Sequence, residues 1–369
     1  MIRVLNIVEC MQAAGIESYI MNVYRNIDRN KIQFDFWVTR NQKEFYDNEI
    51  LNLGGKKFVT DRTKIKSTGI RVIFEAYDLY KFLKREKFEI IQIHTGTPLR
   101  WVYLIAAKMA GVRKRIYHSH SAEVFGPHKG LLIKKIIFSF IKNFIPVFAT
   151  DLFACSEAAG KWMYPRKYQD KVEIIYNGID TKKFKFNDDI RKEYRNKENV
   201  TNEIILGHVA RFNEQKNHTF LIDVFKEVVK ENSNYQLWLI GSGELEEQIK
   251  EKVKKLNLNK NVKFFGVRND VNKIMQAIDI FVLPSNYEGL PVVGIEAQFS
   301  GVQCFFSDKI TKEVEITQNV KFIKLDIKDW KYNILHPNIQ DRNIKVNIKN
   351  SSYDIENTIN KLMKIYSIL

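Results

Sequence analysis

The sequence predicts an α/β fold of two doubly wound, parallel-sheet domains that face each other across a cleft. The chain has 369 residues and 45% apolar content, more than one hydrophobic core usually supports, since single cores rarely grow beyond about 250 to 300 residues. Two series of short apolar strands alternate with amphipathic helices. A charged, Asn-rich passage from 180 to 202 separates the two series and marks the domain boundary.

The first domain is expected over residues 1–180. Its first strand, 2–10, is followed by a loop through Gly15 and a helix over 16–27. Further short apolar runs predict strands over 34–39, 90–94, 115–118, 151–155 and 172–176. The alternation with helices predicts a parallel sheet, because parallel neighbours need a crossover connection.

The second domain is expected over residues 181–351 and repeats this pattern. Its predicted strands cover 203–210, 236–240, 262–265, 278–283 and 303–306. The amphipathic segment 352–369 is expected to form a helix that packs back on the first domain. Because parallel sheets bind ligands beyond the carboxyl ends of their strands, two facing sheets predict a site in the cleft.

The composition is that of a globular protein in a reducing compartment. The three cysteines, Cys10, Cys155 and Cys304, are an odd set without metal-type spacing, so no disulfide framework is expected. No signal peptide is expected before the first strand. Lysines interrupt the best apolar run, 131–148, so nothing approaches the roughly 20 residues of a spanning helix. We therefore expect a cytoplasmic location.

The formal charge of +16 favours anionic partners. Residues 101–150 hold eight Lys or Arg and one acid, Glu123, and 129–148 mixes lysines with bulky apolar residues at roughly helical spacing. One interpretation is peripheral contact with an anionic membrane at the inner face of the cell membrane. The other is an ordinary helix with a solvated basic side.

The most distinctive motif is Phe281-Val-Leu-Pro-Ser-Asn-Tyr-Glu-Gly-Leu-Pro-Val-Val-Gly-Ile-Glu-Ala-Gln-Phe-Ser-Gly301. An apolar strand leads into a polar loop that carries Glu288, Pro291 is expected as the first helical residue, and Gly301 ends the helix. Glu296 then lies on the second turn of that helix. Two carboxylates thus flank a helix start whose amides suit a polyol or a phosphate.

Two cations follow the first strand of the second domain. Arg211 and Lys216 lie just before a helix that starts near His218. Arg offers a planar fork of donors and Lys a flexible charge, which together suit a diphosphate. An exposed loop with two solvated cations explains the same pattern.

Two glycine-containing loops follow strands. Gly241-Ser-Gly243 lacks the third glycine of a dinucleotide fingerprint, and Glu244 and the neighbouring glutamates would repel a pyrophosphate there, so a structural role is favoured. Gly15 joins the first strand to the first helix, where it either lets a backbone amide approach an anion or serves a tight turn.

His118-Ser-His120 ends a strand in the most basic segment. We expect the two imidazoles to point to opposite sides, so that one of them faces the cleft and contacts a sugar hydroxyl. A metal site needs a third ligand, which neither His94 nor His128 supplies by its spacing. His94 is interpreted as a second cleft residue or a hydrogen-bonded core histidine.

Several alternative chemistries lack their motifs. The sequence has no nucleophile elbow with a Ser-His-Asp set and no Gly-x4-Gly-Lys-Ser/Thr loop, which argues against a hydrolase or a phosphate-loop ATPase. No Asp-x-Asp pair follows a strand to hold a divalent cation under a sugar diphosphate. We therefore expect a metal-independent site.

These groups occur in a specific order and spacing: Gly15-Ile-Glu17, Ala154-Cys-Ser-Glu157, Tyr176-Asn-Gly-Ile-Asp180, His208-Val-Ala-Arg211 with Lys216-Asn217, Gly241-Ser-Gly243, and Glu288-Gly-Leu-Pro with Glu296-Ala. The set covers most of the chain. It resembles the retaining GT-B glycosyltransferases, in particular family 4 and its branch of bacterial capsule and exopolysaccharide enzymes.

The resemblance implies a GT-B fold with an acceptor-side first domain and a nucleotide-sugar-binding second domain. Arg211 and Lys216 would hold the donor's diphosphate and offset the charge that grows on the leaving group. Glu296 would accept hydrogen bonds from ribose hydroxyls, while Glu288 would contact hydroxyls of the transferred sugar. With His120, which would face the reacting sugar, Arg211, Lys216 and Glu288 are the expected catalytic residues.

Further donor contacts also follow from the resemblance. Backbone groups near Leu290 and Val293 would orient the sugar, and the base would rest near Val267. Gly15 would meet the donor phosphates from the first domain. The chain departs from the family pattern at Ala14-Gly15, where Gly-Gly is common, and at 302–304, where a Gly-x-Pro run is more usual.

The expected activity is transfer of a hexose or N-acetylhexosamine, with retention of configuration, from a nucleotide-diphosphate donor to a glycan or lipid-linked acceptor in capsule or exopolysaccharide biosynthesis. Family frequency favours UDP, and no cofactor is expected. Two alternatives remain: a nucleotide-sugar epimerase of the same fold, and a non-catalytic basic protein that binds membrane or nucleic acid. A nucleic-acid-binding protein would explain the charge but not the paired glutamates, so no nucleic-acid partner is expected.

Overall fold

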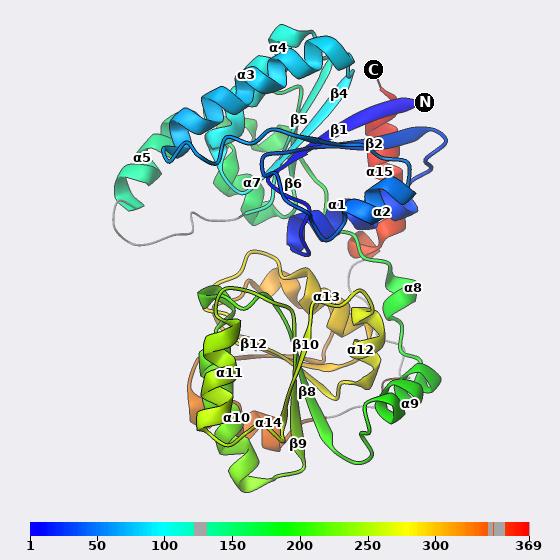
Figure 1. The fold of residues 1–369 in the computed structure, drawn as a ribbon, viewed down its shortest axis with the longest axis vertical. Coiled ribbons are helices and arrows are strands. Elements are labelled where there is room, and N and C mark those ends of the chain that lie inside the picture. Colours follow the sequence, from blue (N-terminus) through cyan, green and yellow to red (C-terminus); the bar gives the residue numbers. More distant parts are fainter. Residues whose placement is uncertain (122–130, 339–341, 343–350, 369) are drawn as a thin grey trace. The chain divides into compact units, whose positions relative to one another are not determined.

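The computed structural model describes residues 1–121, 131–338, 342 and 351–368, with side chains for all of these except 131–134 and 351. The described chain divides into two compact units (Figure 1). Unit 1 comprises Met1–Ile179 and Ser352–Leu369, and unit 2 comprises Asp180–Ser351.

Unit 1 alternates strands with α-helices and short 3-10 helices, the latter labelled η. Its elements are β1 (Ile2–Val8), α1 (Gly15–Asn26), β2 (Ile32–Val38), α2 (Asp47–Asn52), β3 (Lys57–Val59), α3 (Thr68–Glu86), β4 (Ile90–Thr95), η1 (Pro98–Arg100), α4 (Trp101–Ala110), β5 (Lys114–Ser119), α5 (Leu131–Ile141), α6 (Ile145–Phe148), β6 (Asp151–Ala154), α7 (Glu157–Met163), η2 (Arg166–Lys171), β7 (Val172–Ile174) and, after unit 2, α15 (Ile355–Ser367).

Unit 2 follows the same scheme. Its elements are α8 (Thr181–Phe184), α9 (Asp188–Lys197), β8 (Ile204–Val209), η3 (Glu214–Lys216), α10 (His218–Glu231), β9 (Tyr235–Ile240), α11 (Glu246–Lys255), β10 (Val262–Gly266), α12 (Val271–Ala277), β11 (Ile280–Leu283), α13 (Val292–Phe299), β12 (Gln303–Ser307), η4 (Lys312–Val314), β13 (Val320–Ile323) and α14 (Ile327–Leu335), and η5 (Ser351–Tyr353) leads back to unit 1.

Each unit contains one parallel sheet, which confirms the predicted fold class. The strand order is β3-β2-β1-β4-β5-β6-β7 in unit 1 and β10-β9-β8-β11-β12-β13 in unit 2. The order therefore reverses between β1 and β4, and again between β8 and β11. Such reversals leave a crevice beyond the carboxyl ends of the two central strands, where ligands of doubly wound sheets bind.

The strands predicted from apolar runs are all present, with ends that agree within about two residues. The strands β3 and β13 were missed. Both are edge strands of three or four residues with a lysine in them, Lys57 and Lys321. An edge strand is paired on one side only and is often short and charged, so it lacks the apolar run that marks a central strand.

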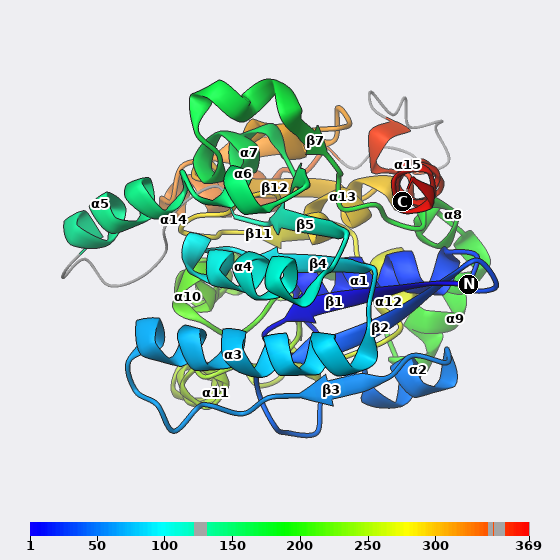
Figure 2. The same cartoon turned by 90° about the horizontal axis from the view of Figure 1, so that it is seen from above.

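Helices cover both faces of the unit 1 sheet (Figures 1 and 2). Alternate residues of β1 pack on opposite faces, with Leu5 and Ile7 in the core under α3 and α4, and Val4 and Val8 in the core under α1 and α15. The final helix α15 is therefore part of unit 1. It contributes Leu362 and Tyr366 to that second core.

No helix among the described residues is both long and apolar enough to span a bilayer.

The packing of α15 predicts a stability cost for truncating Leu362. This side chain is 1% exposed, and a buried Leu→Ala change costs about 2 to 5 kcal/mol. We expect Leu362→Ala to lower the free energy of unfolding of unit 1 by that amount, measured by urea titration and circular dichroism. Asn360→Ala, at an exposed position of the same helix, is the control. Equal losses in both variants would show that α15 does not depend on this packing.

Candidate functional site

The loops that follow β8 and β11 form the main polar cluster of unit 2. These strands are neighbours at the point where the strand order reverses, with Phe281 opposite Gly207. The loop after β8 contains η3 and Lys216, and the loop after β11 contains Glu288. Topology therefore brings together two loops about seventy residues apart in the sequence.

An ion pair joins Lys216 to Glu288 at the centre of this cluster. The other contacts of the carboxylate are polar: Ser285 Oγ donates to Oε1 at 2.8 Å, and Gln215 Nε2 donates to Oε2 at 3.1 Å. The Glu288 side chain is 7% exposed and that of Lys216 is 16% exposed. Both oxygens of the carboxylate thus have partners, which fixes its orientation in a place with little water.

Hydrogen bonds from asparagines fix the shape of the first loop and attach the second loop to it. Asn213 Oδ1 accepts a hydrogen bond from the Lys216 amide at 3.1 Å and so closes η3. Asn286 donates its backbone N–H to the Gln215 carbonyl at 2.8 Å and its side-chain amide to the Glu214 carbonyl at 2.8 Å. Lys216 therefore reaches Glu288 from a backbone that is tied to the opposite loop.

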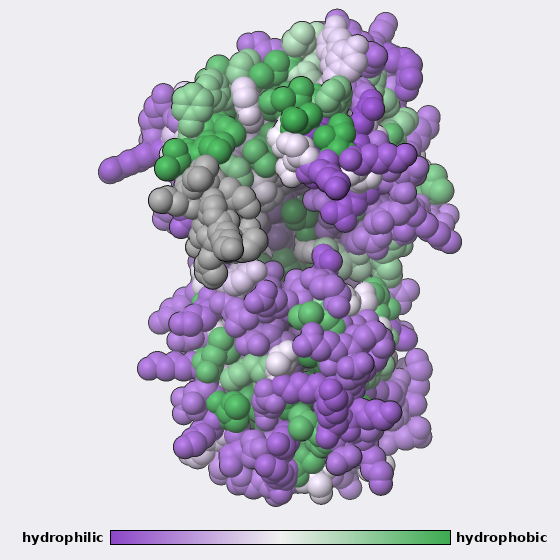
Figure 3. Space-filling model, turned by 60° about the vertical axis from the view of Figure 1, so that its left-hand side comes forward, coloured by the Kyte–Doolittle hydropathy of each residue, from purple (hydrophilic) through white to green (hydrophobic). Residues whose placement is uncertain are grey.

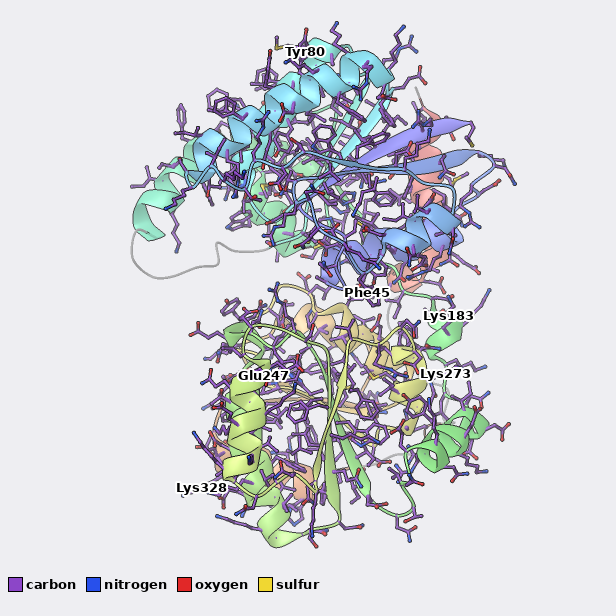
Figure 4. The ribbon with its side chains drawn as sticks, viewed as in Figure 1. Phe45, Tyr80, Lys183, Glu247, Lys273 and Lys328 are labelled. Atoms are coloured by element: carbon purple, nitrogen blue, oxygen red, sulfur yellow. The ribbon has the colours of Figure 1, made fainter. Side chains whose placement is uncertain are left out.

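Arg211 occupies a different environment from Lys216. Its guanidinium lies 3.2 Å from the Glu244 carboxylate, and the two side chains are 64% and 57% exposed. An exposed pair of this kind contributes at most about 1 kcal/mol, so an anion can take the place of Glu244 at low cost. Glu244 was expected to repel a pyrophosphate, but this ion pair offsets its charge. Glu247, also expected to repel, lies at the start of α11 with its side chain 84% exposed (Figure 4).

Gly241 and Gly243 are needed for backbone packing. A Cβ at Gly241 would lie 2.1 Å from the Ala210 oxygen, and one at Gly243 would lie 2.4 Å from the Phe212 oxygen. Gly241 also has φ of +133°, in a region that side chains rarely adopt. The structural interpretation of this Gly-x-Gly loop therefore explains both glycines.

Glu296 lies on α13, one turn beyond the helix start. Burial raises the pKa of its carboxyl to about 7, and no hydrogen bond to this carboxyl is found among the described residues. The helix begins at Val292, and Pro291 is its N-cap residue with ψ of 102°, not its first helical residue as expected from the sequence. No side chain caps α13, so its first amides are available to a ligand.

The remaining predicted donor contacts surround this helix start and the end of β10. Leu290 and Val293 are half-buried beside the N-cap. Val267 is 40% exposed and follows Gly266, whose carbonyl accepts a 2.8 Å hydrogen bond from the Gly241 amide. Val267 is thus held next to the glycine loop and offers an apolar side chain to solvent.

Two buried histidines beside the ion pair were not predicted as site residues. His208 and His218 have ring centroids 4.5 Å apart, and His218 stacks on Phe212 at 4.1 Å. Burial lowers the pKa of His208 to about 4 and that of His218 to about 2. Both rings are therefore neutral near Lys216. Their positions at a strand end and at the first turn of a helix were the available signals in the sequence.

In unit 1, three histidines meet at the ends of β4 and β5. His94 pairs with His118 across the two strands, and the His118 and His120 rings are 4.1 Å apart. The expectation that His118 and His120 point to opposite sides is wrong, because residues two apart in a strand share one face. The cross-strand register adds His94 to the same face, which spacing along the sequence cannot show.

A chain of hydrogen bonds links this group to the centre of the sheet. Asn6 Oδ1 lies 3.0 Å from His94 Nε2, and His94 Nδ1 lies 3.0 Å from His120 Nε2. With Asn6 Oδ1 accepting from His94, the His94 Nδ1 accepts from His120 Nε2–H, which leaves His120 Nδ1 as an acceptor. That buried nitrogen has no protein partner among the described residues. Burial lowers the pKa of His120 to about 3, so the acceptor is neutral.

The three histidines also have the ligand type of a metal site, with one ring nitrogen from each lying within 4.8 Å of the others. Three neutral imidazoles are a ligand set that zinc accepts, so the hydrogen bonds of the rings decide between the two interpretations. Both ring nitrogens of His94 already hold hydrogen bonds. We therefore interpret the group as a hydrogen-bonded cluster.

The loop after β1 carries Gly15, the first residue of α1. No side chain caps this helix, and a Cβ at Gly15 would meet no described atom within 4 Å. Gly15 does not have a positive φ. A tight turn therefore does not require this glycine. Nearby, burial raises the pKa of Glu17 to about 7, which keeps part of its carboxyl neutral and lowers its repulsion of an anion.

The contrast between Gly15 and Gly243 gives a prediction. Gly15→Ala should leave the melting temperature within about 2 °C of wild type, since a surface change without clashes costs less than about 0.5 kcal/mol. Gly243→Ala should lower it clearly, because the new Cβ overlaps the Phe212 backbone. Scanning calorimetry measures both. A clear loss in Gly15→Ala would restore the tight-turn interpretation.

The buried histidines predict a loss of stability in mild acid. Among the histidines that the structure describes, five have a lowered pKa: His94, His118, His120, His208 and His218. Below their ordinary value of 6.5, the unfolded chain takes up protons that the folded chain resists, at up to about 1.4 kcal/mol per pH unit for each group. Three carboxyls with a raised pKa, Glu17, Glu75 and Glu296, act in the opposite sense as the pH falls towards 4.5.

Because five groups outnumber three, we expect the melting temperature to fall as the pH is lowered from 7 to 5. His218→Phe should flatten this dependence, since it removes one buried imidazole whose nitrogens lack described partners. Fluorescence-monitored melting at several pH values tests both points. An unchanged melting temperature over this range would contradict the neutral state assigned to these five histidines.

Comparison with known proteins identifies the family. The family description Glycosyltransferase Family 4 matches residues 13–183, and the description Glycosyl transferases group 1 matches residues 190–325. The chain is 32% identical to EpsF of Bacillus subtilis over 99% of this chain and 96% of EpsF, a protein named as a glycosyltransferase. It is 25% identical to the capsular polysaccharide biosynthesis glycosyltransferase CapH of Staphylococcus aureus, over 99% of each chain.

Solved structures show the same fold. The Anabaena protein HepE, crystallised with UDP and glucose, superposes with a TM-score of 0.77 at 18% identity and full coverage of both chains. WaaG, a glycosyltransferase of lipopolysaccharide biosynthesis, has a TM-score of 0.68 at 14% identity, over 100% of this chain and 97% of WaaG. The chain therefore belongs to the family 4 GT-B glycosyltransferases, in their capsule and exopolysaccharide branch.

Proposed function

We propose that this glycosyltransferase moves a hexose or N-acetylhexosamine from a UDP-sugar to a glycan or lipid-linked acceptor, with retention of the anomeric configuration and without a metal ion. The observation that carries the proposal is the Lys216–Glu288 ion pair at the reversal of strand order, beside the uncapped start of α13. This part of unit 2 thus offers a cation for a phosphate, a carboxylate for sugar hydroxyls and, at the start of α13, free backbone amides.

The donor would occupy unit 2 from Val267 to Glu288. Lys216 and Arg211 hold the diphosphate in this proposal, with Arg211 released from its exposed pair with Glu244. Glu288 contacts sugar hydroxyls while Ser285 and Gln215 keep it oriented. Support for UDP comes from HepE, whose crystals contain UDP, and from an Escherichia coli relative named as a UDP-Gal-dependent galactosyltransferase.

Glu296 and the backbone beside it complete the donor site in this proposal. The Glu296 carboxyl, with its pKa near 7, accepts hydrogen bonds from the ribose hydroxyls in its ionised form. Backbone groups near Leu290 and Val293 orient the sugar, and the base rests near Val267. In unit 1, the Gly15 amide meets the phosphates, and neutral His120 accepts a hydrogen bond from the reacting sugar or the acceptor.

Retention follows if the acceptor hydroxyl attacks the face that the diphosphate leaves. The leaving phosphate then assists the attack by taking the acceptor's proton, and Lys216 and Arg211 offset its growing charge. Glu288 is not a covalent nucleophile in this scheme, because its two oxygens are already held by Lys216, Ser285 and Gln215. Its role is to orient the sugar.

The acceptor proposal rests on the relatives. The Escherichia coli relative, 30% identical over 62% of this chain and 60% of its own length, is named for transfer to a GlcNAc-diphosphoundecaprenol, a lipid-linked sugar. A lipid-linked acceptor would place the enzyme at the inner face of the cell membrane in the cytoplasm.

Lys216→Ala and Glu288→Gln should each lower transfer on the order of 10²- to 10³-fold, because each removes a group that stabilises or orients the reacting donor. The assay is release of UDP from a UDP-sugar in the presence of acceptor lipid, with products analysed for anomeric configuration. Lys273→Ala is the matched control, since Lys273 is an exposed lysine on α12 (Figure 4).

The melting temperature of each variant is measured in parallel to show that it is folded. Turnover near that of wild type in a folded Lys216→Ala or Glu288→Gln protein would refute the proposed roles. Conversion of donor without acceptor would instead favour an epimerase or hydrolase.

A further inference from the structure

The outer face of α3 carries an apolar stripe that the fold does not cover. Ile70, Ile73, Phe74 and Tyr77 follow one another at the i, i+3, i+4, i+7 spacing of a single helix face. They are 52%, 61%, 46% and 54% exposed. Hydrophobic residues gather on the part of unit 1 that Figure 3 brings forward.

This stripe is not the core-facing side of the helix. The opposite side of α3 buries Val72, Ala76 and Leu79 against the sheet. The first half of α3 is thus apolar towards both the core and the solvent, whereas a surface helix usually has a polar outer side. Exposed apolar side chains gathered in this way mark an interaction surface.

Cations continue the same face. One and two turns beyond Tyr77 come Lys81 and Lys84, both exposed, and Lys81 Nζ lies 4.3 Å from the Tyr77 ring centroid. Lys64 and Lys66 are exposed just before the helix.

The acids of α3 add little negative charge to this surface. Each is buried or half-buried and is hydrogen-bonded: Glu75 to Tyr103, Asp78 to Arg62, and Glu86 to Arg85. No exposed acid lies on α3. The outer face therefore combines apolar side chains with positive charge.

The basic segment 101–150, from which membrane contact was expected, uses several of its cations inside the fold. Lys114 donates to the carbonyl of Ile368, Arg115 to that of Phe148, and Lys142 to that of Trp162. Lys129 and the side chain of Lys134 lie outside the described residues. The expected single helix is also two, α5 and α6. The charge of this segment is thus partly structural.

The helix α5 extends the apolar surface near α3. Its Ile136, Ile137 and Phe140 are 63%, 48% and 67% exposed. Both α3 and α5 contact η1, so the two helices lie on the same part of unit 1 (Figure 1).

We propose that the outer face of α3 docks on an anionic lipid bilayer, with Ile70, Ile73, Phe74 and Tyr77 entering the headgroup region and Lys81 and Lys84 meeting the acidic lipids. This combination of an apolar stripe and adjacent lysines is what an interfacial helix requires. A second copy of the chain fits less well, because exposed lysines lie at both ends of the stripe, Lys64 and Lys66 before it and Lys81 and Lys84 after it. A two-fold contact through α3 would therefore bring lysines of the two copies together.

The surface itself is independent of the transfer chemistry, although its use in bringing the enzyme to a lipid-linked acceptor rests on the proposed function. Binding to vesicles without donor or acceptor therefore tests the surface alone. Failure of transfer with normal vesicle binding would refute only the proposed function.

The experiment is flotation of the full chain with vesicles of phosphatidylcholine, alone or mixed with phosphatidylglycerol. Wild type should float with the anionic vesicles and be released by salt, since exposed charges are screened. Ile73→Ser/Phe74→Ser should lower the partition coefficient on the order of tenfold by removing apolar area. Lys81→Gln/Lys84→Gln should also lower it on the order of tenfold, because each lysine near the surface contributes about 1 kcal/mol.

Two controls match these changes elsewhere on the surface. Leu51→Ser removes an exposed apolar side chain, 64% exposed, from α2, and Lys254→Gln/Lys255→Gln removes two exposed lysines from α11. Both should bind vesicles as wild type does. All changes are at exposed positions, and melting temperatures verify folding.

Three results would overturn the proposal. One is absence of wild-type binding to anionic vesicles. Another is undiminished binding by the Ile73→Ser/Phe74→Ser protein. The third is a change in oligomeric mass, measured by sedimentation, in that variant while its vesicle binding is unchanged, which would assign the stripe to contact between copies of the chain.

Discussion

The unit 2 site depends on the ion pair between Lys216 and Glu288, which joins the loops after β8 and β11. These two strands are central neighbours at which the order of the sheet reverses, the point where doubly wound sheets bind their ligands. The pair joins the two loops, and both of its side chains have low exposure. A half-buried pair costs desolvation unless further polar partners complete it, and here Ser285 and Gln215 do so. The site is therefore assembled by the fold before any ligand arrives.

Unit 1 presents a different kind of polar group at its own reversal. Asn6 on β1 and His94 on β4 come from the two strands that flank the reversal, and they are hydrogen-bonded to each other. A second hydrogen bond joins His94 to His120. Burial lowers the pKa of these imidazoles, so they hold and orient hydrogen bonds as neutral groups. In the proposed function, unit 2 supplies cations for the anionic donor, while unit 1 supplies uncharged acceptors suited to hydroxyls.

The central strands and the site loops could be predicted because their residues are locally distinctive. A run such as 280–283 is apolar throughout, and the Glu288 to Glu296 segment combines strand, turn and helix signals in sequence order. Edge strands β3 and β13 lack that signal. The histidine cluster could not be found by spacing, since His94 meets His118 only through the register of β4 and β5. The pairing of Arg211 with Glu244, and the exposure of the α3 stripe, likewise depend on packing that one sequence does not display.

The central claim is that Lys216 and Glu288 act as one unit in holding the donor. A double-mutant cycle on binding, measured by calorimetry with the UDP-sugar that best protects wild type against thermal unfolding, tests it most directly. The account predicts that Lys216→Ala/Glu288→Gln binds this donor about as weakly as the weaker single variant, which corresponds to a coupling energy above about 1 kcal/mol. If the losses of binding free energy in the two single variants add up to that of the double variant within about 0.5 kcal/mol, the two residues act independently, which would contradict the account.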